Sequence, residues 1–349
     1  MNRSGSITPR FRQALILICL DSVLPAVGSS EGRELKSMAA AITIQGLTKK
    51  YIGVGTGEVI AVNNLNLEVA EGEIFGFLGR NGAGKTTTIK MLLGLVFPTA
   101  GDAQILGKPM GDNAIKQEIA YLPEETYFYD SMTGWDLIDY YARLFRIGEP
   151  ERSRRVKIAL EKVRLQPEAW RRSIRGYSKG MRQRIGIAQA LINDPKLLFL
   201  DEPTSGLDPI AHAELRDIVG SLRNEGKTVF LSSHQLADVE LICSRVAIIH
   251  KGKLLTQGTI AELVQGERKA VTVSAPGFSN GMMPKLQAIV PDATHGNGDT
   301  AQFDIDDDER ITAVIDLVRG LNGSVLSIVP HKRTLEEVFV ETVRREDNS

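Results

Sequence analysis

One nine-residue segment constrains the fold of this 349-residue chain more than any other. Residues 79–87 read Gly-Arg-Asn-Gly-Ala-Gly-Lys-Thr-Thr and match the pattern G-x-x-x-x-G-K-[ST] at every fixed position. In such a loop successive backbone N–H groups converge on one anion, which requires glycines with unusual backbone angles. The apolar run Ile74–Leu78 predicts a strand before the loop, and Thr87–Leu95 predicts a helix after it. This order predicts an α/β fold that binds phosphate groups; the alternative is a glycine-rich turn without a ligand.

The loop pattern assigns chemistry to two side chains. Lys85 supplies a positive charge to the β- and γ-phosphates of a nucleotide, and the Thr86 hydroxyl is placed to bind Mg²⁺. A helix that begins near Lys85 directs its positive dipole end at the same phosphates. The candidate nucleotide-binding residues of the loop are Gly79, Asn81, Gly82, Ala83, Gly84, Lys85, Thr86 and Thr87.

A second apolar run, residues 196–200, ends in two acids, Asp201 and Glu202. A continuous apolar run is typical of a strand in the middle of a parallel sheet, and ligands bind at the carboxyl ends of such strands. We therefore expect Asp201 to hold Mg²⁺ and Glu202 to act as a general base on the attacking water. The alternative is that the two acids cap the next helix.

Five further segments follow in an order that resembles the nucleotide-binding subunit of an ABC transporter. They are Tyr51 at the position of the adenine-stacking aromatic, residues 121–124 at the Q-loop, Tyr177-Ser178-Lys179-Gly180-Met181 at the ABC signature, residues 205–208 at the D-loop, and His234 at the switch histidine. The resemblance runs from about Ile42 to Gly266. It implies a P-loop NTPase core, with a mixed sheet flanked by helices, and a helical subdomain over about residues 120–193. It also implies that the chain binds and hydrolyses ATP.

The same resemblance implies roles for single residues. Tyr51 stacks on adenine, although it is also suited to packing on an edge strand, and His234 contacts the γ-phosphate. The remaining implied contacts are Ser178, Gly180 and Asp208 to nucleotide and Glu124 to Mg²⁺. The chain departs from the family pattern at three positions: Glu124 stands in place of Gln, Lys179 in place of Gly and Met181 in place of Gln. We give Met181 no binding role, because its thioether does not donate a hydrogen bond.

The chain carries one phosphate loop and one signature, and the resemblance therefore implies a partner. In the family, ATP lies between the loop of one subunit and the signature of another, so two copies of this chain would enclose two ATP molecules head to tail. ATP would close this dimer and hydrolysis would open it. The resemblance also implies that residues 120–176 receive a helix from an integral membrane permease. Tyr127-Phe128-Tyr129 form either part of that contact or a local core.

The net charge and the cysteine count limit the classes of protein to which this chain can belong. Lys and Arg number 42 against 43 Asp and Glu, a net charge of −1, so a whole-chain basic footprint for nucleic acid is absent and we expect no nucleic-acid partner. The two cysteines exclude a disulfide framework. We expect an ATPase subunit that powers export through a separate permease and lies peripherally on the cytoplasmic face of the membrane. The alternative is a soluble ABC-type ATPase with a regulatory, ribosome-linked or nucleic-acid-linked role.

The expected domains are an extension over residues 1–37, an ATPase domain over 38–266 and a small α/β accessory domain over 267–349. Residues 1–37 resemble a secretion signal, or precede a true start at Met38, which is the interpretation we favour. The accessory domain resembles the tail of drug- and polysaccharide-type exporters and would stabilise or regulate the dimer. Its expected strands are residues 270–274, 300–305 and 324–329, and its expected helices are residues 284–290, 309–321 and 334–343.

Overall fold

The computed structural model describes residues 39–53, 57–264, 267–274, 283–291, 293–295, 300–305, 308–320, 322–332 and 334–348. The expected extension over residues 1–37 lies outside the described residues. The chain forms two compact units that divide between Gly258 and Thr259, eight residues before the boundary expected from the motifs. Each unit is described by itself.

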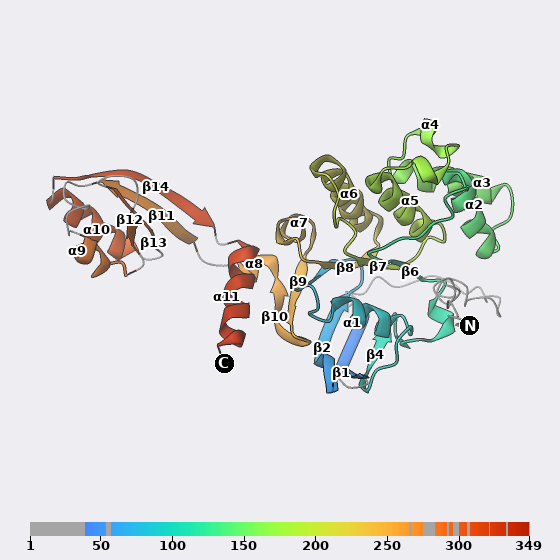
Figure 1. The fold of residues 1–349 in the computed structure, drawn as a ribbon, viewed down its shortest axis with the longest axis horizontal. Helices are drawn as coiled ribbons and strands as arrows, with labels where there is room; N and C mark the ends of the chain where they lie inside the picture. Colours follow the sequence, from blue (N-terminus) through green and yellow to red (C-terminus); the bar gives the residue numbers. More distant parts are fainter. Residues whose placement is uncertain are drawn as a thin grey trace, which may run out of the picture. The chain divides into compact units, whose positions relative to one another are not determined.

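The first unit is built around a six-stranded sheet (Figure 1). Its strands, in spatial order, are β10 (Lys253–Thr259), β9 (Arg245–His250), β3 (Ile74–Leu78), β8 (Thr228–Ser233), β7 (Leu197–Asp201) and β6 (Ile119–Leu122). The five strands from β9 to β6 pair in parallel, and β3, β7 and β8 are buried throughout. Burial on both faces explains why β3 and β7 appear in the sequence as continuous apolar runs, which confirms both predicted strands.

The register of the parallel strands brings four strand ends to one edge of the sheet. Leu78 pairs with Ser233, and Asp201 pairs with Ser232. Leu122 pairs with Leu200 on the other side of β7. The residues that follow these strands therefore emerge side by side, although they lie far apart in the sequence.

A second, antiparallel sheet belongs to the same unit. Its strands are β2 (Gly57–Ala70), β1 (Ala40–Gly53), β4 (Ala100–Ile105) and β5 (Lys108–Pro109), in that order. Buried side chains from both sheets and from α1 (Lys85–Leu92) form one core. Within it the Phe230 ring lies 5.9 Å from Phe75 and 5.2 Å from Phe77, measured between centroids. The core thus holds α1, and the loop that precedes it, against both sheets.

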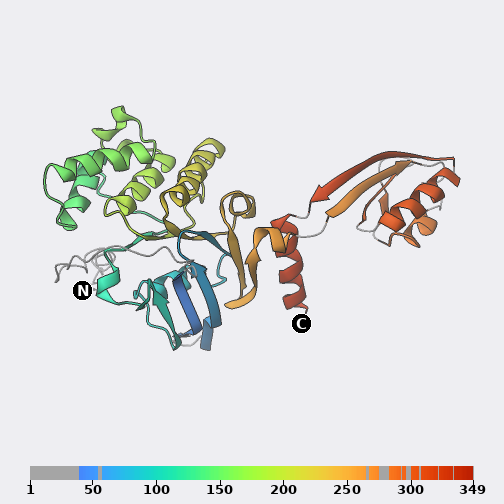
Figure 2. The same cartoon turned by 180° about the vertical axis from the view of Figure 1, so that it is seen from behind.

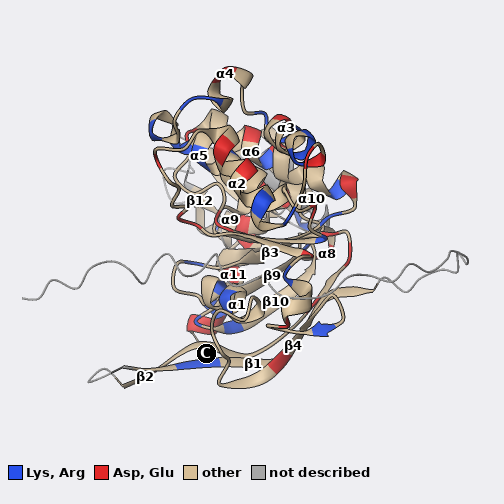
Figure 3. Ribbon diagram, turned by 90° about the vertical axis from the view of Figure 1, so that its right-hand side faces the viewer, with Lys and Arg blue, Asp and Glu red and all other residues tan. Residues whose placement is uncertain are grey.

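The segment between β6 and β7 is helical, as expected. It comprises α2 (Gly134–Leu144), α3 (Glu151–Lys162), α4 (Pro167–Trp170) and α5 (Lys179–Leu191). Figures 1 and 2 show these helices gathered on the opposite side of the six-stranded sheet from β1, β2 and β4. The order Thr133-Gly134-Trp135-Asp136 predicts a helix start, and Thr133 does cap α2 by accepting from the Asp136 backbone N–H. Figure 3 shows positively and negatively charged residues next to one another on α3, where Glu151 pairs with Arg154 and Arg155.

Three predicted helices end earlier than expected, and each ends close to a residue with a left-handed backbone conformation. The helix after the glycine-rich loop ends at Leu92 rather than Leu95, because Gly94 adopts a left-handed φ of 70° and closes it. The sequence also predicts a helix over residues 152–165, and in the structure this helix ends at Lys162, just before Arg164 at a φ of 53°. A third helix is predicted over residues 182–193, directly after the signature; it begins at Lys179 and ends at Leu191, ahead of Asp194 at a φ of 54°.

Two further helices follow the central strands. α6 (Pro209–Leu222) comes after β7, and α7 (Leu236–Ile242) comes after β8. The two helices pack together, and the Ile242 side chain lies against Gly220. Asp208 caps α6 by accepting from the backbone N–H groups of Ile210 and Ala211. The alternative in which Asp201 and Glu202 cap this helix is therefore wrong.

The second unit is a small α/β domain. Its sheet has the order β12 (Thr294–His295), β13 (Thr300–Ile305), β11 (Glu267–Ser274) and β14 (Ser324–Lys332). α9 (Met283–Gln287) and α10 (Asp308–Gly320) contribute to its apolar core, and α8 (Ile260–Leu263) contacts α11 (Leu335–Asp347). These elements confirm the three strands and three helices predicted here; β12 and α8 were not predicted. In the part of the chain that the structure describes, no helix has both the length and the apolarity to cross a bilayer.

Candidate active site

The glycine-rich loop, residues 79–87, runs from the end of β3 into the first turn of α1 and lies at the edge where the strand ends meet. Its backbone requires glycine at two positions. Gly84 has a φ of 108°, and an added Cβ would lie 2.4 Å from the Ala61 carbonyl oxygen. A Cβ on Gly79 would lie 2.6 Å from the Ile249 carbonyl oxygen. The motif glycines therefore allow the loop to pass close to backbone of both sheets.

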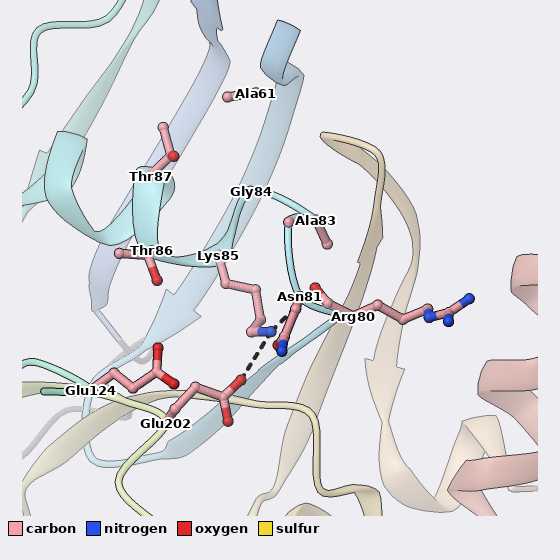
Figure 4. Close-up of a pocket in the computed structure, with 11 residues that line it drawn as sticks. Ala61, Arg80, Asn81, Ala83, Gly84, Lys85, Thr86, Thr87, Glu124 and Glu202 are labelled. Atoms are coloured by element: carbon pink, nitrogen blue, oxygen red, sulfur yellow. Dashed lines mark hydrogen bonds and ion pairs between the residues drawn. The ribbon is translucent and has the colours of Figure 1, made fainter. Parts of the chain in front are cut away.

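A pocket opens over this loop (Figure 4). Its lining consists of Ala61, Arg80, Asn81, Gly82, Ala83, Gly84, Lys85, Thr86, Thr87, Glu124 and Glu202. Most of the predicted loop residues line it, together with the predicted acids Glu124 and Glu202. Ala61 and Arg80 were not predicted. Ala61 arrives from β2, and no sequence pattern marks it; the Arg80 side chain extends away from Lys85 in Figure 4.

Lys85 is buried at the base of the pocket and is held by oxygen atoms. Its Nζ donates to the Gly79 carbonyl at 2.7 Å and forms an ion pair with Oε1 of Glu202 at 2.9 Å. The two side chains are 6% and 4% exposed. Each side chain of the pair offsets part of the cost of burying the other.

Glu202 also contacts His234, the predicted switch histidine. Its Oε2 lies 2.7 Å from Nδ1 of His234 and accepts from the His234 backbone N–H at 3.3 Å. Glu202 has a φ of 49°, a left-handed value that costs a non-glycine residue about 1–3 kcal/mol. Contacts therefore link Lys85, Glu202 and His234 into one chain across the strand ends, and all three were predicted as site residues.

Asp201 lies beside this chain and is 1% exposed. Its Oδ1 accepts from the Ser232 hydroxyl, whereas its Oδ2 has no hydrogen-bond partner among the described residues. A buried carboxylate oxygen without a partner is costly, and a divalent cation or its water would satisfy it. Among the described residues no group of three His, Cys, Asp or Glu side chains is arranged as a metal site. This donor set fits Mg²⁺, which takes few protein ligands and completes its shell with phosphate oxygens and water.

Tyr121 on β6 interacts electrostatically with both predicted metal-binding acids. Burial, together with the charges of Asp201 and Glu124, raises the pKa of Tyr121 above its ordinary value. The phenol is therefore uncharged at neutral pH. It adds no negative charge to the two carboxylates.

The signature segment, residues 177–181, lies outside the pocket of its own chain. Ser178 caps α5, and its Oγ accepts from the Met181 backbone N–H at 3.2 Å. A Cβ on Gly180 would lie 2.8 Å from Cβ of Ala211, so α5 approaches α6 closely there. The Lys179 ammonium lies next to Gly206 of the D-loop. The signature and the D-loop are thus neighbours within one chain.

Two predicted aromatic features lie on exposed surface. Tyr51 is 42% exposed on β1, and its ring lies 5.0 Å from Nζ of Lys49; it is not among the pocket-lining residues. Tyr127 and Tyr129 are 73% and 54% exposed, whereas Phe128 is half-buried against Gly186. The two tyrosines are therefore not a local core.

Comparison with known proteins agrees with this geometry. Residues 62–205 match the family model described as ABC transporter. The chain is 43% identical over 293 residues to an ABC transporter ATP-binding protein of Synechocystis, covering 82% of this chain and 79% of that one. It is 32% identical over 313 residues to Nod factor export ATP-binding protein I of Cupriavidus metallidurans, covering 88% and 99%.

Structural comparison finds the same fold. A dimeric ATP-binding cassette bound to ADP and Pi superposes with a TM-score of 0.58 at 24% identity, covering 62% of this chain and 98% of that one. This confirms the P-loop core, and the sequence relatives confirm the family resemblance. The chain belongs to the ABC transporter family as one of its ATP-binding and ATP-hydrolysing subunits.

Proposed function

We propose that this chain powers export of a substrate through a separate membrane permease, by closing on a second copy of itself around two ATP molecules. The observation that carries the proposal is the Lys85–Glu202–His234 chain at the glycine-rich loop. Export is supported by the relative from C. metallidurans, a Nod factor export protein that this chain matches over 99% of its length. The same relatives favour a transport subunit over a soluble regulatory ATPase.

The geometry suggests how ATP would be used. The ammonium of Lys85 would leave Glu202 for the β- and γ-phosphate oxygens, which releases the Glu202 carboxylate. Glu202 would then accept a proton from water as the water oxygen attacks the γ-phosphorus, and ADP would depart with the bridging oxygen. His234 would donate to the γ-phosphate from the far side of Glu202. Hydrolysis would thus begin only after phosphate has displaced the resting ion pair.

Mg²⁺ would be held by Thr86, Asp201 and Glu124, the last two through water, and would supply positive charge to the phosphates. The unpartnered Oδ2 of Asp201 supports this assignment, and Thr86 and Glu124 line the pocket. Glu124 adds a negative charge where the family pattern has a neutral amide. We infer that Glu124 keeps the cation at this side of the pocket.

A second copy would complete each nucleotide site. Ser178 and Gly180 lie outside the pocket of their own chain, at the start of α5, where backbone N–H groups are suited to a γ-phosphate. The dimeric ADP-bound cassette of the same fold supports this arrangement. Tyr51 would stack on adenine, and Asp208 would orient the D-loop between the copies.

The permease would dock on the helical subdomain beside the exposed Tyr127 and Tyr129. This contact would place the chain on the cytoplasmic face of the membrane. The second unit, residues 259–349, would support the dimer.

Glu202→Gln tests the central step. The variant keeps the shape of the side chain but loses its basicity, so ATP turnover should fall about a thousandfold while ATP binding remains. With saturating ATP and Mg²⁺ the variant should elute as a dimer with two trapped nucleotides. Adding Ser178→Ala should weaken that dimer, because Ser178 would touch only the partner's nucleotide. A monomer at every ATP concentration would refute the sandwich.

The export role has its own test. The chain, expressed with a candidate permease in proteoliposomes, should show ATPase activity that depends on the permease and moves substrate outward from the side that holds ATP. Glu202→Gln in the same vesicles is the control for coupling. Permease-independent ATPase activity without binding to the vesicles would favour the soluble alternative.

A further inference from the structure

A cluster of charged and polar side chains joins α6 to α7 outside the pocket. Asp238 of α7 is 5% exposed, and its Oδ2 lies 2.6 Å from Nε2 of His212 on α6. Its Oδ1 accepts from the Arg216 guanidinium at 3.4 Å. Nε2 of His212 also contacts Oε1 of Gln235. We call His212, Arg216, Gln235 and Asp238 the α6–α7 clasp.

The contacts of the clasp determine which nitrogen atom of His212 carries a hydrogen atom. Both neighbours of the His212 Nε2 atom are oxygen acceptors, so Nε2 carries a hydrogen atom. That hydrogen points to Gln235, and Oδ2 of Asp238 accepts no hydrogen bond from a described residue. The buried carboxylate is therefore held by its closeness to the imidazole and the guanidinium, and removal of either group leaves its charge poorly compensated.

The position of the clasp gives it a consequence. α6 begins at the D-loop, where Asp208 caps it, and Ala211 on its first turn packs against Gly180 of the signature. On the other side of the clasp, Gln235 directly follows His234, whose Nδ1 lies 2.7 Å from Glu202. A continuous set of contacts thus runs from the signature, through α6 and the clasp, to the histidine beside Glu202.

We propose that the α6–α7 clasp positions His234 against Glu202, which makes His212 and Asp238 positioning residues for ATP hydrolysis. The inference rests on the proposed roles of His234 and Glu202. The side chain of His234 is 42% exposed, so its own surroundings hold it weakly. The clasp anchors the residue next to it to the helix that carries the D-loop. Closure of the dimer on the signature and the D-loop would reach His234 by this route.

The first experiment compares His212→Ala, His212→Gln and Asp238→Asn in steady-state ATPase assays. His212→Ala and Asp238→Asn should lower kcat about tenfold, because a small misplacement of an aligned group costs an order of magnitude or more. KM for ATP should stay within about twofold, since no clasp residue lines the pocket. His212→Gln, whose amide N–H can replace that of Nε2, should recover most of the loss.

Asp217→Asn is the matched control. Asp217 lies on the same helix, and its side chain is 55% exposed. It pairs with Arg164 and with Arg216 of the clasp, each at 3.9 Å, and exposed pairs of this length contribute little. We expect its kcat and KM to equal those of the wild type. Equal damage from Asp217→Asn and His212→Ala would show that α6 tolerates no charge change, and would overturn the clasp. Thermal melting identifies variants that fail to fold; His212→Gln and Asp238→Asn, which keep the side chains' size, serve if His212→Ala is among them.

A double-mutant cycle with His234→Ala decides whether the clasp acts through His234. If it does, His212→Ala should change the residual kcat of His234→Ala by less than about twofold. The same tenfold loss in both backgrounds would mean that His212 acts elsewhere, and would overturn the clasp while leaving the role of His234 intact. Wild-type kcat in His234→Ala alone would overturn both, because the clasp would then position a residue without a role in hydrolysis.

Discussion

Two buried regions of the molecule differ in the side chains that they contain. The strand-end edge of the six-stranded sheet holds charged side chains, whereas the core of the second unit holds apolar ones. The edge encloses Lys85, Asp201 and Glu202, with a left-handed backbone at Glu202 and an unpartnered oxygen on Asp201. The second core consists of apolar side chains such as Leu286 and Phe303. Buried charge and backbone strain cost stability, whereas buried apolar area supplies it. The contrast indicates that the side chains at the edge serve the reaction, whereas the side chains of the second core stabilise the fold.

Asp201→Asn should lower the activity of the protein while raising its thermal stability. Loss of the carboxylate should lower ATPase activity about a thousandfold, because a metal ion contributes several kcal/mol to the transition state. Tm measured by calorimetry without nucleotide and Mg²⁺ should rise, because no unpartnered charge then remains buried. A lower Tm would mean that the hydrogen bond from Ser232 outweighs the cost of burial.

Lys85→Ala should lower ATP affinity about a hundredfold in a fluorescence titration, since the phosphates lose a buried point charge. Unlike Asp201→Asn, it should also lower Tm, because buried Oε1 of Glu202 loses its ionic partner and only the contacts of Oε2 with His234 remain. Lys90→Ala, on the same helix, is the control and should alter neither quantity. Unchanged ATP binding in Lys85→Ala would contradict the assignment of the loop.

Leu286→Ala should do the reverse of the edge variants. Leu286 is fully buried, so its truncation should destabilise the second unit by about 2–5 kcal/mol. ATPase activity should stay within about twofold, because the reacting groups lie in the first unit. Hydrogen exchange of β11 and β14 would report the loss, and Leu286→Met, which conserves volume, should cost less than about 1.5 kcal/mol. A large fall in activity would show that the second unit supports catalysis.

Thr334→Ala should give the smallest effect. Thr334 caps α11 by accepting from the Glu337 backbone N–H, and loss of such a cap costs about 1 kcal/mol. Faster hydrogen exchange in the first turn of α11, with unchanged exchange in α1, would locate the effect. Thr334→Ser should keep the cap, and an equal loss in that variant would point to packing of the methyl group instead.

The sequence allowed prediction of the site wherever the chemistry is written in consecutive residues. The glycine-rich loop and the Asp201–Glu202 pair follow buried apolar strands, and both patterns are visible without a structure. His234, Ser178, Tyr51 and Asp208 came from the family resemblance instead, and their roles stay predictions. Ala61 was missed because its contact with Gly84 joins two separate elements. The α6–α7 clasp was missed because a lone histidine and a lone aspartate on different helices form no pattern.

Element types were predicted better than element ends. The early ends of α1 and α3 depend on left-handed residues, Gly94 and Arg164, and a left-handed arginine has no sequence signal. β12 has only two residues, too few for a periodicity. Tertiary contacts set these features.

The approach of Gly79 and Gly84 to carbonyls of both sheets has a consequence for the robustness of the protein. A methyl group at either position would act as a wedge, driving the loop away from the Ile249 or the Ala61 carbonyl and misaligning the N–H groups that it carries. The backbone conformation of the loop therefore depends on the two sheets as much as on the sequence of the loop. Substitutions elsewhere in the chain that shift Ile249 or Ala61 by a fraction of an ångström would therefore weaken nucleotide binding, even though every motif residue is unchanged.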